Sequence, residues 1–120
     1  MTQSNISPKR GEIWMVNLYP TVGAEMRKVR PTIVVSSDHV GILPVKLVVP
    51  VTDWKDWYAR NAWHVRIDPD AANGLTKASA ADVLQLRGVD TQRFIRRLGQ
   101  ISKDVLQVVT DAIVIVVEAV

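Results

Sequence analysis

Short apolar segments rich in valine and isoleucine recur along most of this chain, and turn residues bound each of them. Segments of this length and composition are typical of β-strands. Residues 62–67 alternate between apolar and polar side chains, which predicts a strand with one exposed face. We predict strands at residues 12–18, 32–37, 46–51, 62–67, 81–86 and 94–98.

The hydrophobic period changes near the C-terminus. From Val105 to Val117 the apolar side chains recur at steps of three and four residues, and Ser102 is a candidate N-cap. We predict a helix over residues 103–118, with a strand at 113–117 as the alternative because valine and isoleucine are frequent there. Antiparallel strands followed by one helix predict a mainly β fold, a small barrel or half-barrel with a packed helix.

The composition predicts one domain over residues 1–120, since 48% of the residues are apolar and can form a core. Residues 1–7 are polar, are expected to be flexible and do not form a secretory signal. Gln107, Thr110 and Asp111 interrupt the longest apolar stretch, so no membrane span is expected. The absence of cysteine excludes disulfides and fits a cytoplasmic protein.

Sequence motifs for metal or cofactor chemistry are missing. His39 and His64 are the only histidines, and they are not spaced as zinc ligands. The chain has neither a glycine-rich phosphate loop nor the Gly-x-Ser-x-Gly segment of esterases. We therefore expect no metal and no cofactor.

The net charge of +3 is too small to indicate a nucleic-acid ligand, but the distribution of the basic residues is informative. Five of them lie between residues 9 and 30 with two acids, and five lie between residues 87 and 103 with one acid. Nine of the 15 basic residues are arginine, which binds phosphate oxygens in pairs. If these two segments converge in space, they form a surface for an anionic ligand.

Arg30 precedes Pro31 at the start of an apolar segment. Proline disfavours helical backbone at the residue before it, so Arg30 is expected to be extended at the mouth of a strand, where it can meet a phosphate. Thr52 follows Pro50, which cannot donate to a strand ladder and predicts a sheet edge or a bulge. Each candidate residue also has an ordinary interpretation. Arg30 can form a surface ion pair, and the Thr52 hydroxyl can end a strand. Glu25, in the basic loop before Arg30, can pair with Arg27 or Lys28.

Residues 54–60 combine aromatic and charged side chains, with Trp54, Trp57 and Tyr58 at helical spacing. Two interpretations are open. Aromatic residues interleaved with basic ones suit stacking on unpaired RNA bases. The same spacing suits the apolar face of a short helix that packs on the core or on a second copy of the chain.

The order of these features resembles the MazF/PemK (Kid) family of toxin endoribonucleases, whose fold is shared with the CcdB toxins. The resemblance extends from about residue 7 nearly to the end of the chain. Its most specific parts are the Arg-Gly-Glu-Ile-Trp start, the Gly-x-Glu loop and the Arg-Pro strand, in this order and spacing. The segments that carry it are residues 9–14, 17–25, 29–36, 49–52 and 83–90, followed by Arg93 and the terminal helix.

This resemblance implies a small SH3-like β-barrel of the CcdB/Kid type with a C-terminal helix, and metal-independent cleavage of single-stranded RNA at short sequences. The RNA 2′-hydroxyl attacks the adjacent phosphate and leaves a 2′,3′-cyclic phosphate and a 5′-hydroxyl. The family's catalytic arginine and threonine fall on Arg30 and Thr52, and Glu25 is a candidate for the base or for substrate positioning. The residues expected to bind RNA are Arg27, Lys28, Trp54, Trp57, Arg60, Gln85 and Arg87.

The resemblance also implies partners. Family toxins act as homodimers with the RNA cleft across both protomers, and a cognate antitoxin covers that cleft with an acidic, flexible tail. The main alternative is a CcdB-like toxin that binds DNA gyrase without cleaving RNA, and a third interpretation is a nucleic-acid-binding barrel that has lost its activity. The Arg30–Pro31 strand and Thr52 favour the nuclease, because gyrase binding does not need them. Asp53 departs from the family pattern, in which a small residue is frequent after the threonine.

Overall fold

The computed structural model describes residues 7–40 and 43–119, and residues 1–6 of the segment expected to be flexible lie outside the described residues. Among these residues, the short 3₁₀ helices η2 (Asp56–Arg60), η3 (Val83–Gln85) and η4 (Thr91–Arg93) lie in the connections. The longer elements are β1 (Glu12–Asn17), β2 (Val29–Val34), β3 (Val45–Asp53), β4 (His64–Ile67), β5 (Ser79–Asp82), β6 (Arg87–Asp90), β7 (Phe94–Gln100) and α1 (Lys103–Val116).

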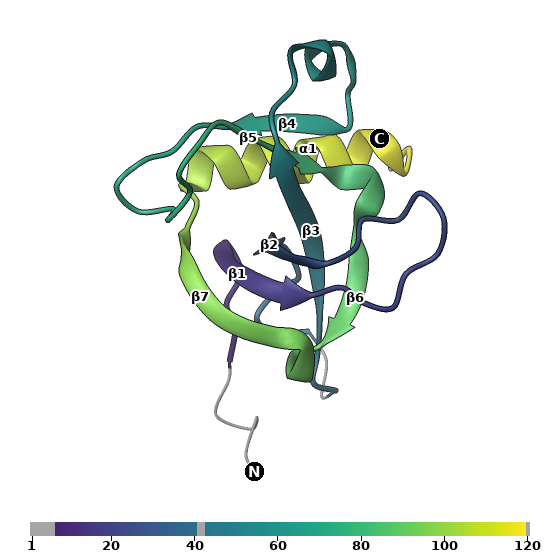
Figure 1. Cartoon of the computed structure of the whole chain (residues 1–120), viewed down its shortest axis with the longest axis vertical. Helices are drawn as coiled ribbons and strands as arrows, with labels where there is room; N and C mark the ends of the chain where they lie inside the picture. Colours follow the sequence, from purple (N-terminus) through teal and green to yellow (C-terminus); the bar gives the residue numbers. More distant parts are fainter. Residues whose placement is uncertain (1–6, 41–42, 120) are drawn as a thin grey trace.

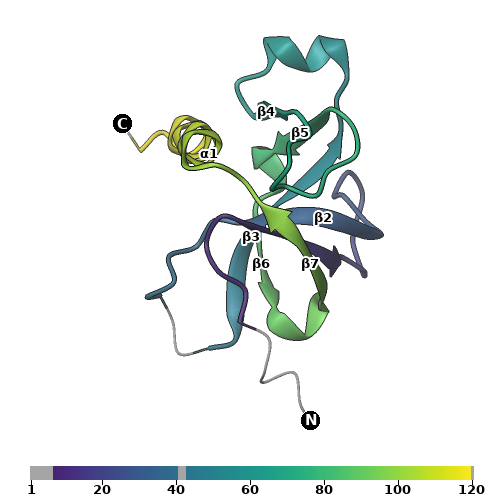
Figure 2. The same ribbon diagram turned by 90° about the vertical axis from the view of Figure 1, so that its left-hand side faces the viewer.

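The strands form one antiparallel sheet in the order β4-β5-β3-β2-β1-β7, and β6 pairs with the first half of β3. Strand β3 runs through the whole molecule, so β6 and β5 pair with different ends of it (Figure 1). The sheet curls into an open, barrel-like form and α1 lies across β4 and β5 (Figure 2). The predicted mainly β fold with a C-terminal helix is confirmed.

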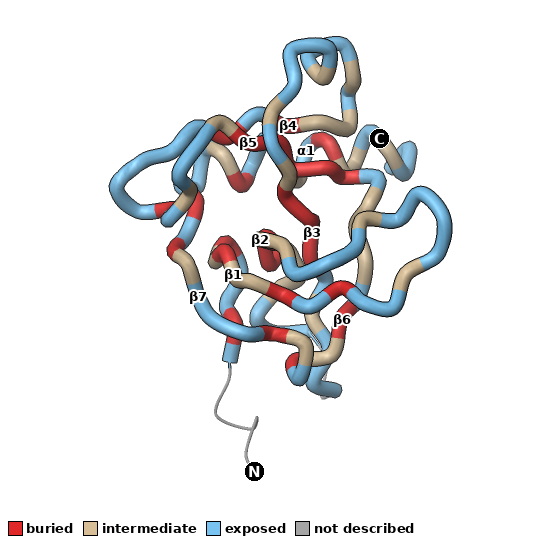
Figure 3. Tube along the Cα trace, viewed as in Figure 1, coloured by how far each residue is buried: buried red, intermediate tan, exposed pale blue. Residues whose placement is uncertain are grey.

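The apolar segments are continuous because the central strands are buried on both faces. Ile33 and Val34 are neighbours in β2 but pack into different core clusters, and Val49 and Val48 do the same in β3. One cluster lies under α1, and the other is closed by β6 and β7 (Figure 3). A fixed core on both faces holds the β2 and β3 backbones in place, which matters for the side chains at their ends.

Helix α1 begins at the predicted residue and ends at Val116, slightly before the predicted end. The Ser102 hydroxyl accepts a hydrogen bond of 3.1 Å from the Val105 N–H, so the predicted N-cap is confirmed. The alternative strand at 113–117 is wrong, because α1 continues to Val116. Its helical period buries Leu106, Val109 and Ala112 against the core. Among the helices of the described residues, none is both long and apolar enough to cross a bilayer.

Three predicted strand features need correction. Strand β2 begins at Val29, so Arg30 lies within a strand ladder with β1. Pro50 lies in an inner strand, so the predicted edge is wrong, but the neighbour of β3 changes there from β6 to β5. The predicted strand at 81–86 ends at Asp82, because its carboxylate accepts a 3.1 Å hydrogen bond from the Leu84 N–H and starts η3. Strand β6, which follows η3, was not predicted.

Candidate active site

Arg30 and Thr52 are brought together by the register of β2 and β3. The ladder pairs Thr32 with Pro50. When the same register is continued by two residues along each strand, Arg30 lies opposite Thr52. Residues directly opposite each other on antiparallel strands lie on the same face, so the Arg30 and Thr52 side chains project from the same face of the sheet. The Arg30 Nη1 lies 3.5 Å from the Thr52 Oγ1, and both side chains are half-buried.

The Arg30 guanidinium is held at its Nε, and its terminal nitrogens have only a long contact with the Thr52 hydroxyl among the described residues. Its Nε donates a 2.9 Å hydrogen bond to the Arg27 carbonyl, which orients the plane of the group. The next residue, Lys28, has a φ of 77°, in the left-handed region, at the bend that leads into β2. Within residues 7–40 and 43–119, Arg30 has no ion-pair partner, so the surface ion pair considered from the sequence is wrong.

Arg30 and Thr52 line a pocket of about 200 Å³. Its far wall comes from the end of the β4–β5 connection, which the sequence did not indicate as functional. Lys77 lies there, with its Nζ 3.1 Å from the Asp53 Oδ2. The residues that line the pocket are Val29, Arg30, Pro31, Val51, Thr52, Asp53, Leu75, Thr76, Lys77 and Ser79.

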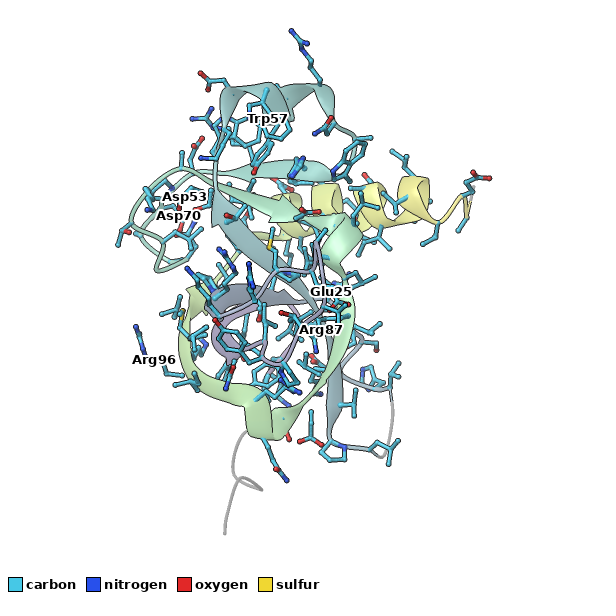
Figure 4. All side chains as sticks on the ribbon, turned by 45° about the vertical axis from the view of Figure 1, so that its right-hand side comes forward. Glu25, Asp53, Trp57, Asp70, Arg87 and Arg96 are labelled. Carbon is cyan, nitrogen blue, oxygen red and sulfur yellow. The ribbon has the colours of Figure 1, made fainter. Side chains whose placement is uncertain are left out.

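Glu25 lies in the loop between β1 and β2 and lines a second hollow, of about 380 Å³. Its carboxylate accepts a 2.7 Å hydrogen bond from the Val22 N–H and closes a turn within the loop. Among the described residues, no ion pair joins Glu25 to a neighbouring basic residue. Figure 4 shows Glu25 beside Arg87, with Asp53 and Trp57 at other parts of the surface.

The second hollow is held together by side chains that bind the backbone of the β1–β2 loop. The Gln85 Oε1 accepts a 2.9 Å hydrogen bond from the Met26 N–H, and its Nε2 donates to the Ala24 carbonyl at 3.2 Å. The Arg87 Nη1 donates a 3.2 Å hydrogen bond to the Leu18 carbonyl at the start of the loop. Gln85 and Arg87, both expected to bind RNA, therefore fix the loop that carries Glu25, Arg27 and Lys28.

Residues 54–60, called the aromatic segment below, form η2 and a short extended stretch that stands above β4 (Figures 1 and 4). The Tyr58 ring stacks on His64 at a centroid distance of 3.8 Å, and Trp54 and Trp57 meet the Tyr58 ring edge-on. Trp57 is 61% exposed, whereas Trp54 and Tyr58 are half-buried. Packing therefore accounts for Trp54 and Tyr58, and Trp57 presents most of its side chain to solvent.

His64 connects this aromatic cluster to η3. Its Nδ1 lies 3.1 Å from the Asn61 amide nitrogen and its Nε2 lies 3.5 Å from the Asp82 carboxylate. Burial raises the pKa of Asp82, and the neighbouring His64 only partly offsets this. Because Asp82 also caps η3, one carboxylate ties the aromatic segment to the element that carries Gln85.

The predicted site residues thus occupy three neighbouring regions. Arg30 and Thr52 share one pocket, while Glu25, Gln85 and Arg87 line the second hollow. The remaining predicted RNA-binding residues are exposed or half-buried around these regions: Arg27 and Lys28 in the β1–β2 loop, and Trp54, Trp57 and Arg60 in the aromatic segment.

Residues 9–117 match the model of the PemK-like, MazF-like toxins of type II toxin–antitoxin systems. This chain belongs to that family. It is 33% identical over 101 residues to the endoribonuclease MazF9 of Mycobacterium tuberculosis, and this alignment covers 78% of this chain and 82% of the relative. It is 29% identical over 105 residues to the endoribonuclease EndoA of Bacillus subtilis, which covers 88% of this chain and 90% of the relative.

Solved structures of the MazF fold superpose closely on this toxin. MazF of Deinococcus radiodurans gives a TM-score of 0.79 at 22% identity, over 95% of this chain and 99% of that one. MazF in a MazE–MazF complex from the same organism gives a TM-score of 0.74 at 22% identity, over 97% and 100% of the two chains. The barrel-like fold and the family expected from the sequence are both confirmed.

Proposed function

We propose that this toxin is a metal-independent endoribonuclease that cuts single-stranded RNA at short sequences. Its relatives MazF9 and EndoA are endoribonucleases, which supports the activity. The observation that carries the proposal is the Arg30–Thr52 pair: a cation whose only side-chain partner among the described residues is a neutral hydroxyl, at the edge of a pocket. Such a cation is available to a phosphate.

The proposed reaction uses a nucleophile that the RNA itself supplies. The 2′-oxygen bonds to the adjacent phosphorus and the bond from phosphorus to the 5′-oxygen breaks, leaving a 2′,3′-cyclic phosphate and a 5′-hydroxyl. The 2′-hydroxyl loses one proton to water and the departing 5′-oxygen gains one from water, so the overall reaction neither consumes nor releases protons. The protein therefore has to hold the phosphate in line and neutralise the charge that develops on its non-bridging oxygens.

Arg30 and Thr52 suit this task by their chemistry. A guanidinium stays protonated at neutral pH, so Arg30 stabilises the phosphate electrostatically through two parallel hydrogen bonds and is not the base. The Thr52 hydroxyl donates one further hydrogen bond to the same phosphate. The β2 and β3 backbones that carry both groups lie on a buried core, which supports a site that needs no rearrangement to bind.

The second hollow is the proposed place for a base of the RNA next to the cut. Glu25, with its carboxylate engaged by the Val22 N–H, is proposed to position the substrate. Gln85 and Arg87 are proposed to shape this region, and Arg27 and Lys28 to bind the RNA backbone. Trp57 supports a stacking contact because its ring is exposed next to Arg60 in the same short helix.

The proposed partners follow the family. An antitoxin with an acidic, flexible tail is proposed to cover the same cleft, since an acidic peptide carries the same sign of charge as RNA. MazF occurs with MazE in the Deinococcus complex, which supports an antitoxin partner. A homodimer with the RNA cleft across both protomers, acting in the cytoplasm, completes the proposal.

One assay tests this function. Purified toxin is incubated with total RNA in EDTA, and the ends of the products are analysed. We expect cleavage that leaves 2′,3′-cyclic phosphates and 5′-hydroxyls. No cleavage, or cleavage that needs an added metal, contradicts the proposal. If the protein leaves RNA intact and inhibits DNA gyrase, the CcdB-like alternative is supported. The endoribonuclease relatives do not favour that alternative.

A further inference from the structure

Lys77 and Asp53 form an ion pair on the wall of the Arg30–Thr52 pocket. Both residues line the pocket, and the Lys77 Nζ lies 3.1 Å from the Asp53 Oδ2. The two side chains are 66% and 58% exposed. The pair therefore lies in water at the opening of the pocket, and the ammonium group has free donors besides the one used by Asp53.

The backbone at Lys77 is held beside the pocket. The Ser79 hydroxyl donates a 2.9 Å hydrogen bond to the Lys77 carbonyl, and the Trp54 N–H donates one of 3.1 Å to the Ala78 carbonyl. The β3–β5 ladder also pairs Asp53 with Ser79. Lys77 therefore enters the pocket wall from an anchored segment, and only its side chain has to move to meet a ligand.

An exposed lysine–carboxylate pair contributes little to stability, so a ligand of higher charge can displace the carboxylate easily. A phosphodiester of single-stranded RNA carries one charge per nucleotide, and its neighbours add to the local field. In the free toxin Lys77 neutralises Asp53, which would otherwise repel RNA at the edge of the pocket. The lysine thus has two effects on an incoming phosphate: it supplies a cation and it screens an anion.

We propose that Lys77 binds the RNA phosphate next to the one that is cut, and that Asp53 holds the lysine in position until RNA arrives. This inference rests on the proposed ribonuclease function, because Arg30 and Thr52 hold the scissile phosphate. The subsite recognises the phosphodiester backbone and adds affinity independently of base sequence.

The test uses an RNA oligonucleotide that the toxin cleaves, with a 2′-deoxy substitution at the cleaved position so that it binds without reacting. Its Kd is measured at several salt concentrations for the wild type and for Lys77→Ala. We expect Lys77→Ala to weaken binding by about five- to tenfold and to reduce the salt slope by about 0.7, the value for one phosphate contact on a single strand. Lys103→Ala removes the same charge at the exposed start of α1 and should change neither quantity.

A second pair of variants tests the role of Asp53. With Lys77 present, Asp53→Asn should change the Kd by less than about twofold, because the lysine already neutralises the carboxylate. In the Lys77→Ala background the same change should tighten binding by about threefold or more, because the carboxylate is then unneutralised. Each variant is checked for an unchanged melting temperature, because the pair is exposed. If Asp53→Asn has the same effect on the Kd in both backgrounds, the role given to Asp53 is overturned.

The failures are distinguishable. If the wild type cleaves RNA but Lys77→Ala binds the deoxy oligonucleotide with unchanged Kd and salt slope, the Lys77 subsite is wrong and the proposed function stands. If Lys77→Ala weakens binding of an acidic peptide but not of RNA, the subsite belongs to a protein partner and the inference is also overturned. A wild type that does not cut RNA overturns the proposed function itself.

Discussion

The Arg30–Thr52 pocket and the Glu25–Gln85 hollow are both polar and both flank the β1–β2 loop, but their side chains have different partners. The Arg30 Nε donates to the Arg27 carbonyl at 2.9 Å, but the partner of its Nη1 is the neutral Thr52 hydroxyl, at 3.5 Å. Gln85 binds the loop backbone at 2.9 and 3.2 Å, and Glu25 binds it at 2.7 Å. The terminal nitrogens of Arg30 face a pocket and have a distant neutral hydroxyl as their partner among the described residues, so they are available to a phosphate. The polar groups of Gln85 and Glu25 are used by the loop backbone and shape the surface around the pocket.

Arg30→Ala gives the largest expected effect. Removing the cation that neutralises the reacting phosphate should lower kcat/KM by about 10³-fold, as for loss of a transition-state hydrogen-bond donor. The melting temperature should change by no more than about 2 °C, because the guanidinium makes two hydrogen bonds within the described part of the chain and one of them is long. Arg96→Ala, an exposed residue on β7, is the matched control and should keep full activity.

Trp57→Ala tests whether the aromatic segment forms a third functional region. Its exposed ring should contribute one base stack, so RNA affinity should fall by about tenfold, within the range of about 1–3 kcal/mol per stacked base. Binding to the deoxy oligonucleotide and the melting temperature are measured together. A large fall in melting temperature with unchanged affinity would mean that Trp57 packs for stability, as Tyr58 does against His64.

Gln85→Ala should separate the hollow from the pocket. Loss of both hydrogen bonds to the β1–β2 loop should raise KM by about threefold to tenfold while kcat stays within about twofold, because the loop positions substrate and Arg30 lies on a strand. Gln85→Glu keeps the acceptor for the Met26 N–H and should give an intermediate KM. A fall in kcat as large as that of Arg30→Ala would remove the distinction between the two regions.

Glu12→Gln perturbs the scaffold and neither region. Partial burial raises the pKa of Glu12, but hydrogen bonds from the Trp14 indole, the Lys9 N–H and Arg97 together lower it below its ordinary value of 4.5. A lowered pKa means that the ionised carboxylate stabilises the fold above pH 4.5 and that this stabilisation is lost as the pH falls through the folded-state pKa.

Glu12→Gln should therefore lower the free energy of unfolding at pH 7 by about 1–2 kcal/mol, the cost of weakening hydrogen bonds to a charged group. The difference from the wild type should shrink in acid, which denaturant unfolding at several pH values measures. Cleavage by the folded fraction should not change. A change in kcat would show that the scaffold is coupled to the pocket.

The sequence predicted what depends on local chemistry. Pro31 keeps Arg30 extended, Ser102 starts α1, and the helical period of the last segment buries Val109, and all three are observed. The start of β2 was misplaced because the ladder with β1 extends through Pro31 to Val29, and pairing across strands is not visible in a short apolar segment.

Lys77 could not be predicted, because its place depends on how the β4–β5 connection folds back on β7. Buried Asn73 holds this connection through the Asp68 carbonyl and the Leu75 N–H. Gly99 allows the close approach, since a Cβ there would lie 2.2 Å from the Ala72 carbonyl oxygen. The Asn73 hydrogen bonds are local, but the approach of Ala72 to Gly99 joins distant parts of the chain, and the sequence around Lys77 gives no sign of it.

The most direct test of the central claim is a double-mutant cycle on single-turnover RNA cleavage in EDTA, with Arg30→Ala, Thr52→Ala and the double variant. If the two residues hold one phosphate together, Thr52→Ala should slow cleavage by about ten- to a hundredfold, and the double variant should be no slower than Arg30→Ala within about threefold. Effects that multiply fully, or a Thr52→Ala protein that cleaves at the wild-type rate, would contradict a shared phosphate site.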